Sequence, residues 1–421
     1  MIKLRSLKGT YDILPGESYK WRHLENAIHE ICAQYGYHEI RTPIFEQSQL
    51  FSRSVGEESD IVNKEMYSWE DKSKSFLTLR PELTASVVRA FNQHNLGSLS
   101  PIQRFYYIGP LFRRERPQKG RQRQFHQFGI ETFGSNLAEQ DAEVIALAWQ
   151  ILSHFGLEKK MELQLNSIGT NICRSAYLKA LKKFLKPYFD ELSEASKKRF
   201  NTNPLRILDT KNEKGLSILK NGPRISDYYT AEDKEHFNEL KTYLDALNIP
   251  FSINVRLVRG LDYYTKTVFE ITSDELGAQD ALLGGGRYDA LVQHLGGKPT
   301  PGIGFAAGIE RILLLINEKD MKLSYPAPDI YFICLEKEGI PISLDITKKL
   351  RLKGYKIISD TLRRSMKAQM RDANKVGARY ILILGENELL DKSIMFKDLE
   401  NGKQEKIKQI NIIDFFDNLA N

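Results

Sequence analysis

The chain has 421 residues, 41% of them hydrophobic, and this length predicts at least two domains rather than a single core. No apolar run approaches the roughly 20 residues that span a bilayer, the first residues lack the apolar stretch of a signal peptide, and Cys32, Cys173 and Cys334 lie far apart. The cysteine spacing favours a reduced cytoplasm over a disulfide framework or a zinc site, and the net charge of +7 is compatible with nucleic acid without identifying it.

The first elements alternate between helix and strand patterns. Residues 18–36 carry apolar positions at helical spacing and end at a glycine, and 81–95 reads as a second helix. Between them, 37–46 alternates like a strand that Pro43 stops.

A long hairpin follows. Residues 102–115 and 122–134 read as two strands joined by the basic loop "RERPQKGRQ", so we expect antiparallel pairing. An amphipathic helix at 138–156 comes next, and lysine-rich helix signals at about 171–226 break the strand rhythm. We interpret this last stretch as a helical insertion.

The sheet pattern then resumes. We expect a helix at 228–247, strands at 251–258 and 268–273, a glycine turn with a helix at 284–297, and a glycine-rich strand running into a helix at 300–316. The fold class predicted for residues 1–325 is therefore α+β, an antiparallel sheet flanked by helices.

A proline-rich stretch, "SYPAPD" at 324–329, marks the predicted domain boundary. Beyond it, three short strands alternate with two helices, which predicts a small α/β domain over 326–421. The strands are expected at 330–335, 355–360 and 379–385, and the helices at 343–354 and 365–377.

Familiar nucleotide and metal motifs are absent from the sequence: there is no GxxxxGK[ST], no GxGxxG and no HExxH. The chemistry is concentrated instead in the hairpin. Its basic loop could be an ordinary solvated surface, but Arg113 belongs to the strand rather than to the loop tip. On the return strand Gln127, Gly129 and Glu131 alternate and share one face. Polar groups on a covered sheet are costly unless a ligand meets them, and a strand arginine suits a phosphate.

Two further arginines repeat this theme. Arg311 enters the apolar run "ILLLI" near a helix start, which favours a phosphate partner. Arg259 opens "RGLDYY" after a strand-like run, where it could either meet a ligand or pair with Asp262 to brace a turn.

These stretches together resemble the histidyl-tRNA synthetase family of class II aminoacyl-tRNA synthetases over essentially the full length. "YGYHEIRTPIFE", "FRRERPQKGRQRQFHQFGIE" and "PGIGFAAGIERI" resemble class II motifs 1, 2 and 3. "LVRGLDYY" and "GGGRYD" match the two more specific histidine-family signatures, and "TLRPELTA" also matches closely, although Leu83 stands where many bacterial relatives have glycine.

The resemblance implies a role for particular residues in binding ATP. Arg113 and Arg259 would flank the α-phosphate as the catalytic pair, Glu115 and Phe125 would face the adenine, and Arg121 and Arg311 would grip the outer phosphates. Mg²⁺ would accompany the ATP, with no dedicated protein site for a metal.

The resemblance also implies residues for the other two substrates. The histidine-binding set would be Glu82, Thr84, Arg113, Gln127, Glu131, Arg259, Tyr263 and Tyr264, with Glu131 and Tyr264 reading the imidazole. Arg116, Gln118 and Arg123 on the hairpin loop would contact the acceptor end of tRNA(His).

A cytoplasmic homodimer with a C-terminal anticodon-binding domain completes what the resemblance implies. One alternative is a synthetase-like, histidine-binding regulatory subunit of histidine biosynthesis without aminoacylation activity. Others are a class II synthetase for proline, threonine or glycine, and a basic RNA-binding protein with a decayed site.

Overall fold

The structure is a computed structural model that describes residues 4–56, 59, 61–118, 120–210, 212–277, 280–316 and 327–419. The chain forms two compact units, Met1–Leu323 and Ser324–Asn421. The first half, 324–326, of the proline-rich stretch expected as a linker, 324–329, lies outside the described residues. Within the described ranges, no helix is both long and apolar enough to cross a membrane.

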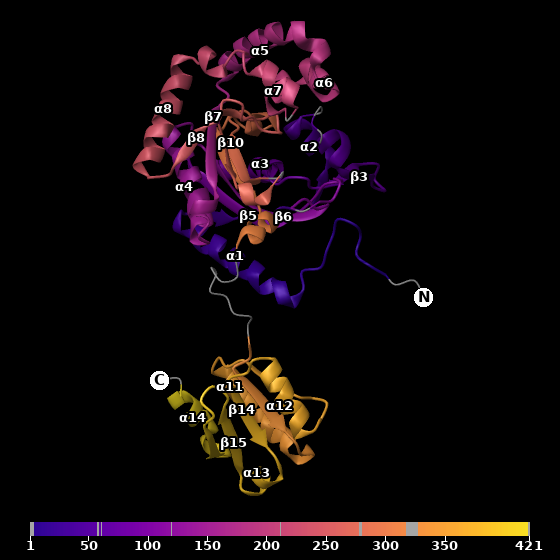
Figure 1. Ribbon diagram of the computed structural model, residues 1–421, viewed down its shortest axis with the longest axis vertical. Helices are drawn as coiled ribbons and strands as arrows, with labels where there is room; N and C mark the ends of the chain where they lie inside the picture. Colours follow the sequence, from indigo (N-terminus) through magenta and orange to yellow (C-terminus); the bar gives the residue numbers. More distant parts are fainter. Residues whose placement is uncertain are drawn as a thin grey trace. The chain divides into compact units, whose positions relative to one another are not determined.

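The first unit is built on an eight-stranded sheet, ordered β1-β5-β6-β11-β10-β9-β7-β8. Strands β5, β6, β7, β8 and β10 of this sheet are labelled in Figure 1. The bounds are β1 His38–Glu39, β5 Gln103–Phe112, β6 Gln124–Phe133, β7 Glu162–Ser167, β8 Phe251–Ile253, β9 Thr265–Thr272, β10 Ala281–Arg287 and β11 Gly302–Gly308. The six inner strands pair antiparallel, as predicted, whereas β1 with β5 and β7 with β8 pair parallel. The sheet is therefore mixed at its two edges.

Helices cover both faces of this sheet. One core cluster joins the apolar stripes of α1 (Pro15–Gln34), α4 (Ala138–His154) and α8 (Ala231–Ala246) to the sheet, together with α10 (Ile309–Leu315). A second cluster joins α3 (Thr84–Gln93) to the other side. Burying a face of each helix against the sheet is what fixes the strands that carry the polar residues of interest.

Three strand expectations need correction. Residues 37–46 form two separate strands, because β2 (Phe45–Gln47) leaves the large sheet after Pro43 and joins a three-stranded sheet with β3 (Tyr67–Glu70) and β4 (Phe76–Leu79). The predicted strand at 251–258 ends at Ile253, since Leu257 N bonds to Asn254 O at 2.9 Å and turns the chain. Arg259 therefore lies in a loop.

The third correction concerns the glycines at 284–286. They were expected in a turn but lie inside β10, paired with β9 on one side and β11 on the other. The absence of side chains there leaves room above the sheet for other groups.

The predicted insertion is helical. It contains α5 (Asn171–Leu185), α6 (Glu194–Thr202) and α7 (Glu213–Leu219), joined by short 3₁₀ segments. These helices gather at one end of the first unit (Figure 1).

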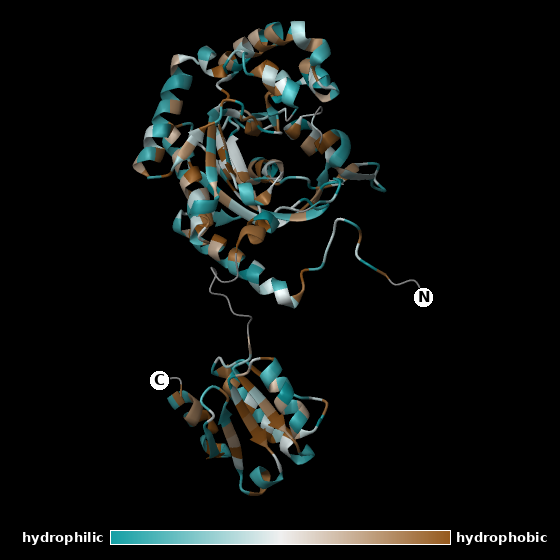
Figure 2. Cartoon of the chain, viewed as in Figure 1, coloured by the Kyte–Doolittle hydropathy of each residue, from teal (hydrophilic) through white to brown (hydrophobic). Residues whose placement is uncertain are grey.

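The second unit is a five-stranded sheet ordered β13-β12-β14-β15-β16. The predicted strands correspond to β12 (Ile330–Cys334), β13 (Ile357–Ser359) and β14 (Tyr380–Leu384), and the predicted helices to α11 (Ile340–Leu352) and α12 (Met366–Lys375). Four elements of this unit were not predicted from the sequence: α13 (Glu386–Leu390), β15 (Ser393–Asp398), β16 (Gln404–Lys408) and α14 (Ile412–Leu419). The strands carry mainly apolar side chains and the helices more polar ones (Figure 2), as expected of a small α/β domain.

Candidate active site

A cavity of about 290 Å³ lies on the sheet of the first unit. Its wall contains every residue proposed above for histidine or ATP, although these came from four separate stretches of sequence, 82–84, 113–131, 259–264 and position 311. They are Glu82, Thr84, Arg113, Glu115, Arg121, Phe125, Gln127, Glu131, Arg259, Tyr263, Tyr264 and Arg311. The sheet register brings them together, and the individual roles remain predictions.

Glu131 occupies an enclosed part of this cavity. Its side chain is 1% exposed, and it accepts hydrogen bonds from the hydroxyls of Thr84 at 2.6 Å, Tyr107 at 3.2 Å and Tyr288. Burial raises the pKa of the Glu131 carboxyl to about 8, although the hydroxyls of Thr84 and Tyr288 act in the opposite direction. A neutral or ionised carboxyl can therefore be reached near neutral pH.

Aromatic rings surround that carboxyl. Tyr263 lies beside Tyr264 with ring centroids 4.6 Å apart, and it meets Tyr288 edge to face at 5.6 Å. Tyr107 and Tyr288 were missed by the sequence analysis, although Tyr288 lies within the quoted signature "GGGRYD". These rings shape a slot suited to a planar, polar side chain.

Glu82 provides a second buried carboxyl, 4% exposed, just before α3. It accepts a hydrogen bond from the backbone N–H of Ala85 at 2.8 Å. Burial raises its pKa to about 7, and the backbone N–H groups of Ala85 and Thr84 partly offset that effect. Such a carboxyl is a fitting partner for an ammonium group.

Arg113 lies in the same wall, one residue after β5. Its Nε donates to Pro81 O at 2.9 Å, and its guanidinium carbon lies 5.2 Å from the centre of the Phe125 ring. Burial lowers the pKa of Arg113, and Glu65 and Glu82 raise it. Because its charge remains at neutral pH, this arginine presents a fixed, oriented cation to the cavity.

Arg259 approaches from the loop before β9. Its Nη1 donates to Glu270 Oε1 at 2.6 Å, not to Asp262, so the alternative of a turn braced by Asp262 is wrong. Burial lowers the Arg259 pKa, but Glu270 outweighs it and the net pKa is raised. Glu270 was not predicted, although a lone carboxylate in the buried strand "TKTVFEIT" was a usable signal.

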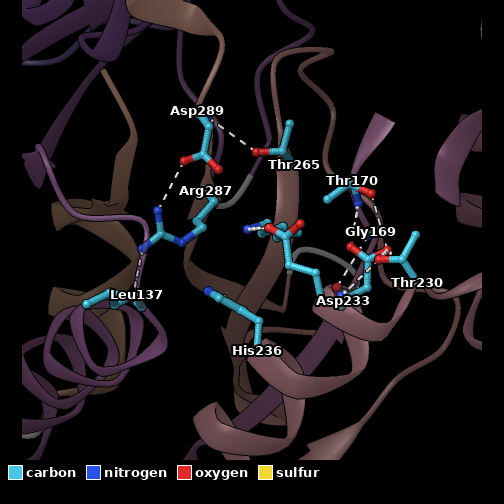
Figure 3. Close-up of polar contacts among 12 residues, drawn as sticks. Leu137, Gly169, Thr170, Thr230, Asp233, His236, Thr265, Arg287 and Asp289 are labelled. Carbon is cyan, nitrogen blue, oxygen red and sulfur yellow. Dashed lines mark hydrogen bonds and ion pairs between the residues drawn. The ribbon is translucent and has the colours of Figure 1, made fainter. Parts of the chain in front are cut away.

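The space for Arg259 comes from the glycine signature. A Cβ at Gly284 would lie 2.0 Å from Arg259 Nη2. Arg287, the arginine of the same signature, faces elsewhere. It is fully buried, pairs with Asp141 at 2.7 Å and Asp289 at 3.0 Å, and donates to Leu137 O (Figure 3). It therefore braces β10 against α4 and does not line the cavity.

A cluster of positive charge lies at the hairpin side. Arg311 donates to Gly120 O at 3.0 Å and to Ala281 O at 2.7 Å. Burial lowers the Arg311 pKa, and Arg113 and Arg121 lower it further. Arg121 pairs with Glu115 and lies 3.8 Å from Glu65. Three arginines that repel one another make this end of the cavity receptive to an anion.

The three residues predicted to contact tRNA do not line the cavity. Arg116 and Gln118 are exposed on the hairpin loop. Arg123 lies at the base of the loop, where its backbone N–H donates to Gly9 O at 2.8 Å and its Nε to Glu115 O at 3.3 Å. His126, the hairpin histidine, contacts Glu310 through Nδ1 at 3.0 Å.

Comparison with known proteins agrees with this architecture. A family model described as "Histidyl-tRNA synthetase" matches residues 9–312, and one described as "Anticodon binding domain" matches 329–419. The curated "Histidine--tRNA ligase" of Caldanaerobacter subterraneus subsp. tengcongensis is 46% identical over 401 residues, covering 95% of this chain and 96% of that relative.

Solved structures give the same result. Apo histidyl-tRNA synthetase of S. aureus is 37% identical with a TM-score of 0.83, covering 99% of this chain and 100% of that one. A Bacillus halodurans C protein described as "ATP phosphoribosyltransferase regulatory subunit/histidyl-tRNA synthetase" matches at 21% identity and a TM-score of 0.65, over 89% of this chain and 97% of its own, and shows the shared fold alone.

These relatives match nearly the whole chain, and the chain has the mixed sheet with an arginine-lined cavity. The protein is therefore a class II aminoacyl-tRNA synthetase. Within that class, the chain belongs to the histidyl-tRNA synthetase family.

Proposed function

We propose that this protein ligates L-histidine to tRNA(His) through a histidyl-adenylate, consuming ATP and releasing AMP and pyrophosphate. The observation that carries the proposal is the single cavity that holds an enclosed carboxyl, Glu131, among tyrosines and also holds Arg113 and Arg259. The enclosed carboxyl among tyrosines suits an imidazole, and the two arginines suit the α-phosphate.

Histidine recognition follows from hydrogen-bond matching. Each imidazole nitrogen needs a partner, and Glu131 on one side with the Tyr264 phenol on the other would supply both. An apolar side chain would leave these buried groups unpaired, which costs on the order of 10⁴-fold in selectivity in comparable sites. Glu82, Thr84, Gln127 and Tyr263 would hold the rest of the amino acid.

Adenylate formation requires a carboxylate to attack the α-phosphorus, and both groups are anions. Arg113 and Arg259 offset the repulsion and stabilise the charge that gathers in the transition state. No general base is needed, because the substrate carboxylate is already ionised near neutral pH. Glu115 and Phe125 would face the adenine, with Arg121 and Arg311 on the outer phosphates. Those two arginines are paired within the protein here, so ATP would replace their contacts with Glu115, Gly120 and Ala281.

Mg²⁺ would enter with ATP rather than through the protein alone. Among the described residues, no group of three or more histidine, cysteine or acidic side chains could hold a metal ion. Mg²⁺ commonly binds through substrate phosphates and one or two carboxylates, and the carboxylate of Glu270 is within the cavity wall. Bound there, the ion would neutralise charge on the outer phosphates.

Transfer to tRNA would use the hairpin loop and the second unit. Arg116, Gln118 and Arg123 would contact the acceptor end from the loop, where positive charge suits a phosphate backbone. We assign residues 1–325 to catalysis and 326–421 to anticodon binding, where unpaired loop bases would be read. Because its substrate is tRNA, we place the protein in the cytoplasm.

We also propose a homodimer. Ile44, Phe45, Trp69 and Phe76 expose 41–62% of their surface around the small three-stranded sheet. Clustered large apolar side chains of this kind are typical of an interface, and a second copy of this chain is the expected partner.

The regulatory-subunit alternative is less well supported, since the chain retains Arg113, Arg259 and Arg311 in one cavity as well as the anticodon-binding match. The decisive experiment is amino-acid-dependent exchange of pyrophosphate into ATP with each of the twenty amino acids. We expect exchange with histidine alone and without tRNA. Failure of the folded protein to exchange with histidine would support the regulatory subunit, and exchange with proline, threonine or glycine would refute the specificity.

A further inference from the structure

The helical insertion is anchored at its base by one buried carboxylate. Asp233, 1% exposed, is in the first turn of α8 and accepts from Thr170 N at 2.7 Å and Thr170 Oγ1 at 3.2 Å. It also accepts from Thr230 N at 3.0 Å and Thr230 Oγ1 at 2.8 Å (Figure 3). Thr170 and Thr230 immediately precede α5 and α8, so Asp233 ties the two ends of the insertion together. The first turn of α5 is thereby fixed relative to the sheet.

From this fixed base the insertion contacts the loop 259–264 at two points. Arg174, in the first turn of α5, donates from Nη1 to Tyr264 O at 2.9 Å, while its Nη2 donates to Asn171 Oδ1 at 2.8 Å. Asn203, at the C-terminal end of α6, donates from Nδ2 to Asp262 Oδ1 at 2.5 Å. Two different helices of the insertion therefore contact adjacent parts of one loop.

Residues 259–264 of this loop belong to no helix or strand, and β9 begins only at Thr265. Among the described residues, the backbone hydrogen bond that joins the loop to the rest of the sheet domain is a long one, 3.4 Å from Asp262 N to Val55 O. Its other contacts are made by side chains, the Arg259–Glu270 pair and the buried rings of Tyr263 and Tyr264. Yet this loop carries Arg259, Tyr263 and Tyr264 into the cavity. Shifts of about 1 Å in such a loop change recognition strongly, because hydrogen bonds and near-attack geometry tolerate little displacement.

We propose that the helical insertion positions the histidine-binding loop, with Arg174 and Asn203 as positioning residues that act through the Tyr264 carbonyl and the Asp262 carboxylate. This inference rests on the proposed function, since it concerns the same site. Neither side chain lines the cavity, so both act on histidine indirectly, by holding Tyr264 in place.

The test is a set of variants measured by histidine-dependent pyrophosphate exchange: Asn203→Ala, Asp262→Ala, the double variant and Arg174→Met. We expect Asn203→Ala and Arg174→Met to raise the KM for histidine roughly two- to twelvefold, the range for losing one hydrogen bond, with the KM for ATP unchanged. The double variant should be no worse than Asp262→Ala alone, because Asn203 acts through Asp262.

The matched control is Asn212→Ala, which removes a helix cap elsewhere in the insertion, where Asn212 Oδ1 accepts from Gly215 N at 3.0 Å. It should lower the melting temperature without changing the KM for histidine. An unchanged histidine KM in folded Asn203→Ala and Arg174→Met, or an equal rise in Asn212→Ala, would refute the inference. Failure of the proposed function is distinguishable, since the wild-type protein itself would then show no histidine-dependent exchange.

Discussion

Replacing Gly284 with alanine should slow adenylate formation strongly while leaving the fold intact. The new Cβ would lie 2.0 Å from Arg259 Nη2 and 2.3 Å from the guanidinium carbon, whereas ordinary contact begins near 3.4 Å. The obstacle is the end of a flexible side chain, so the guanidinium can move away by about 1.4 Å and the backbone need not shift. That displacement is enough to break the 2.6 Å bond to Glu270, since hydrogen bonds weaken beyond about 3.2 Å.

The expected magnitude follows from the role of Arg259. Losing one donor to a developing transition-state charge costs about 2.7–4 kcal/mol, or roughly a hundred- to thousandfold in rate. We therefore expect Gly284→Ala to slow single-turnover adenylate formation by that factor at saturating ATP and histidine, and we expect the same of Arg259→Ala.

The control for Gly284→Ala is Gly16→Ala, at a glycine in α1 with nothing within 4 Å of the added Cβ. It should keep the rate, and its melting temperature should stay the same or rise slightly because alanine favours a helix more than glycine does. A folded Gly284→Ala protein with a normal adenylation rate would show that the position of Arg259 does not limit the chemistry.

Four other changes have expected outcomes. The folded-state pKa of the Glu131 carboxyl is raised to about 8, above its unfolded value of about 4.3. Its contribution to the free energy of unfolding is therefore full below about pH 4.3 and is lost as pH rises through about 8. Glu131→Gln should flatten this fall in stability, measured by melting curves of the histidine-free protein between about pH 5 and 8. Arg116→Ala should slow transfer to tRNA several-fold more than pyrophosphate exchange, and equal slowing would refute the assigned role. A chain ending near Tyr325 should retain histidine activation but charge tRNA poorly, and undiminished charging by a folded truncation would contradict the assignment of residues 326–421. Phe76→Glu should shift the protein to monomers in analytical ultracentrifugation, and an unchanged dimer would place the interface elsewhere.

Local patterns were sufficient to predict much of the fold. The hairpin of β5 and β6 and the helices α1, α4 and α8 follow from apolar spacing and turn residues that lie within each segment. The two parallel edge pairings were not predictable in this way, because β1 with β5 and β7 with β8 join segments far apart in the chain. The strand expected at 251–258 failed because an asparagine turn ended it. The pattern of side chains was strand-like, but the backbone hydrogen bonds were local.

The residues of the site also divide into those that local sequence patterns predict and those that only the folded structure brings together. Arg113, Glu131 and Arg259 carried signals of their own, as charged residues beside apolar ones. The partners of these residues carried no such signal. Tyr107 and Tyr288 reach Glu131 only through the register of four strands, β5, β6, β11 and β10. Glu270 reaches Arg259 from β9, the strand paired with Gly284. A single sequence cannot show which of many tyrosines or glutamates will occupy such a neighbouring position.

The glycines of the signatures make sense once these partners are known. Gly284 leaves space for the Arg259 guanidinium, and a Cβ at Gly304 would lie 2.0 Å from Glu131 Oε2. A Cβ at Gly129 would lie 2.4 Å from the Tyr107 hydroxyl that bonds the same carboxyl. These glycines come from three different strands, β10, β11 and β6, and each makes room for a polar group of the cavity. Glycine lowers the stability of a strand because it has no side chain to pack. At these positions that loss of packing is what leaves room for the Glu131 carboxyl and the Arg259 guanidinium on the surface of the sheet.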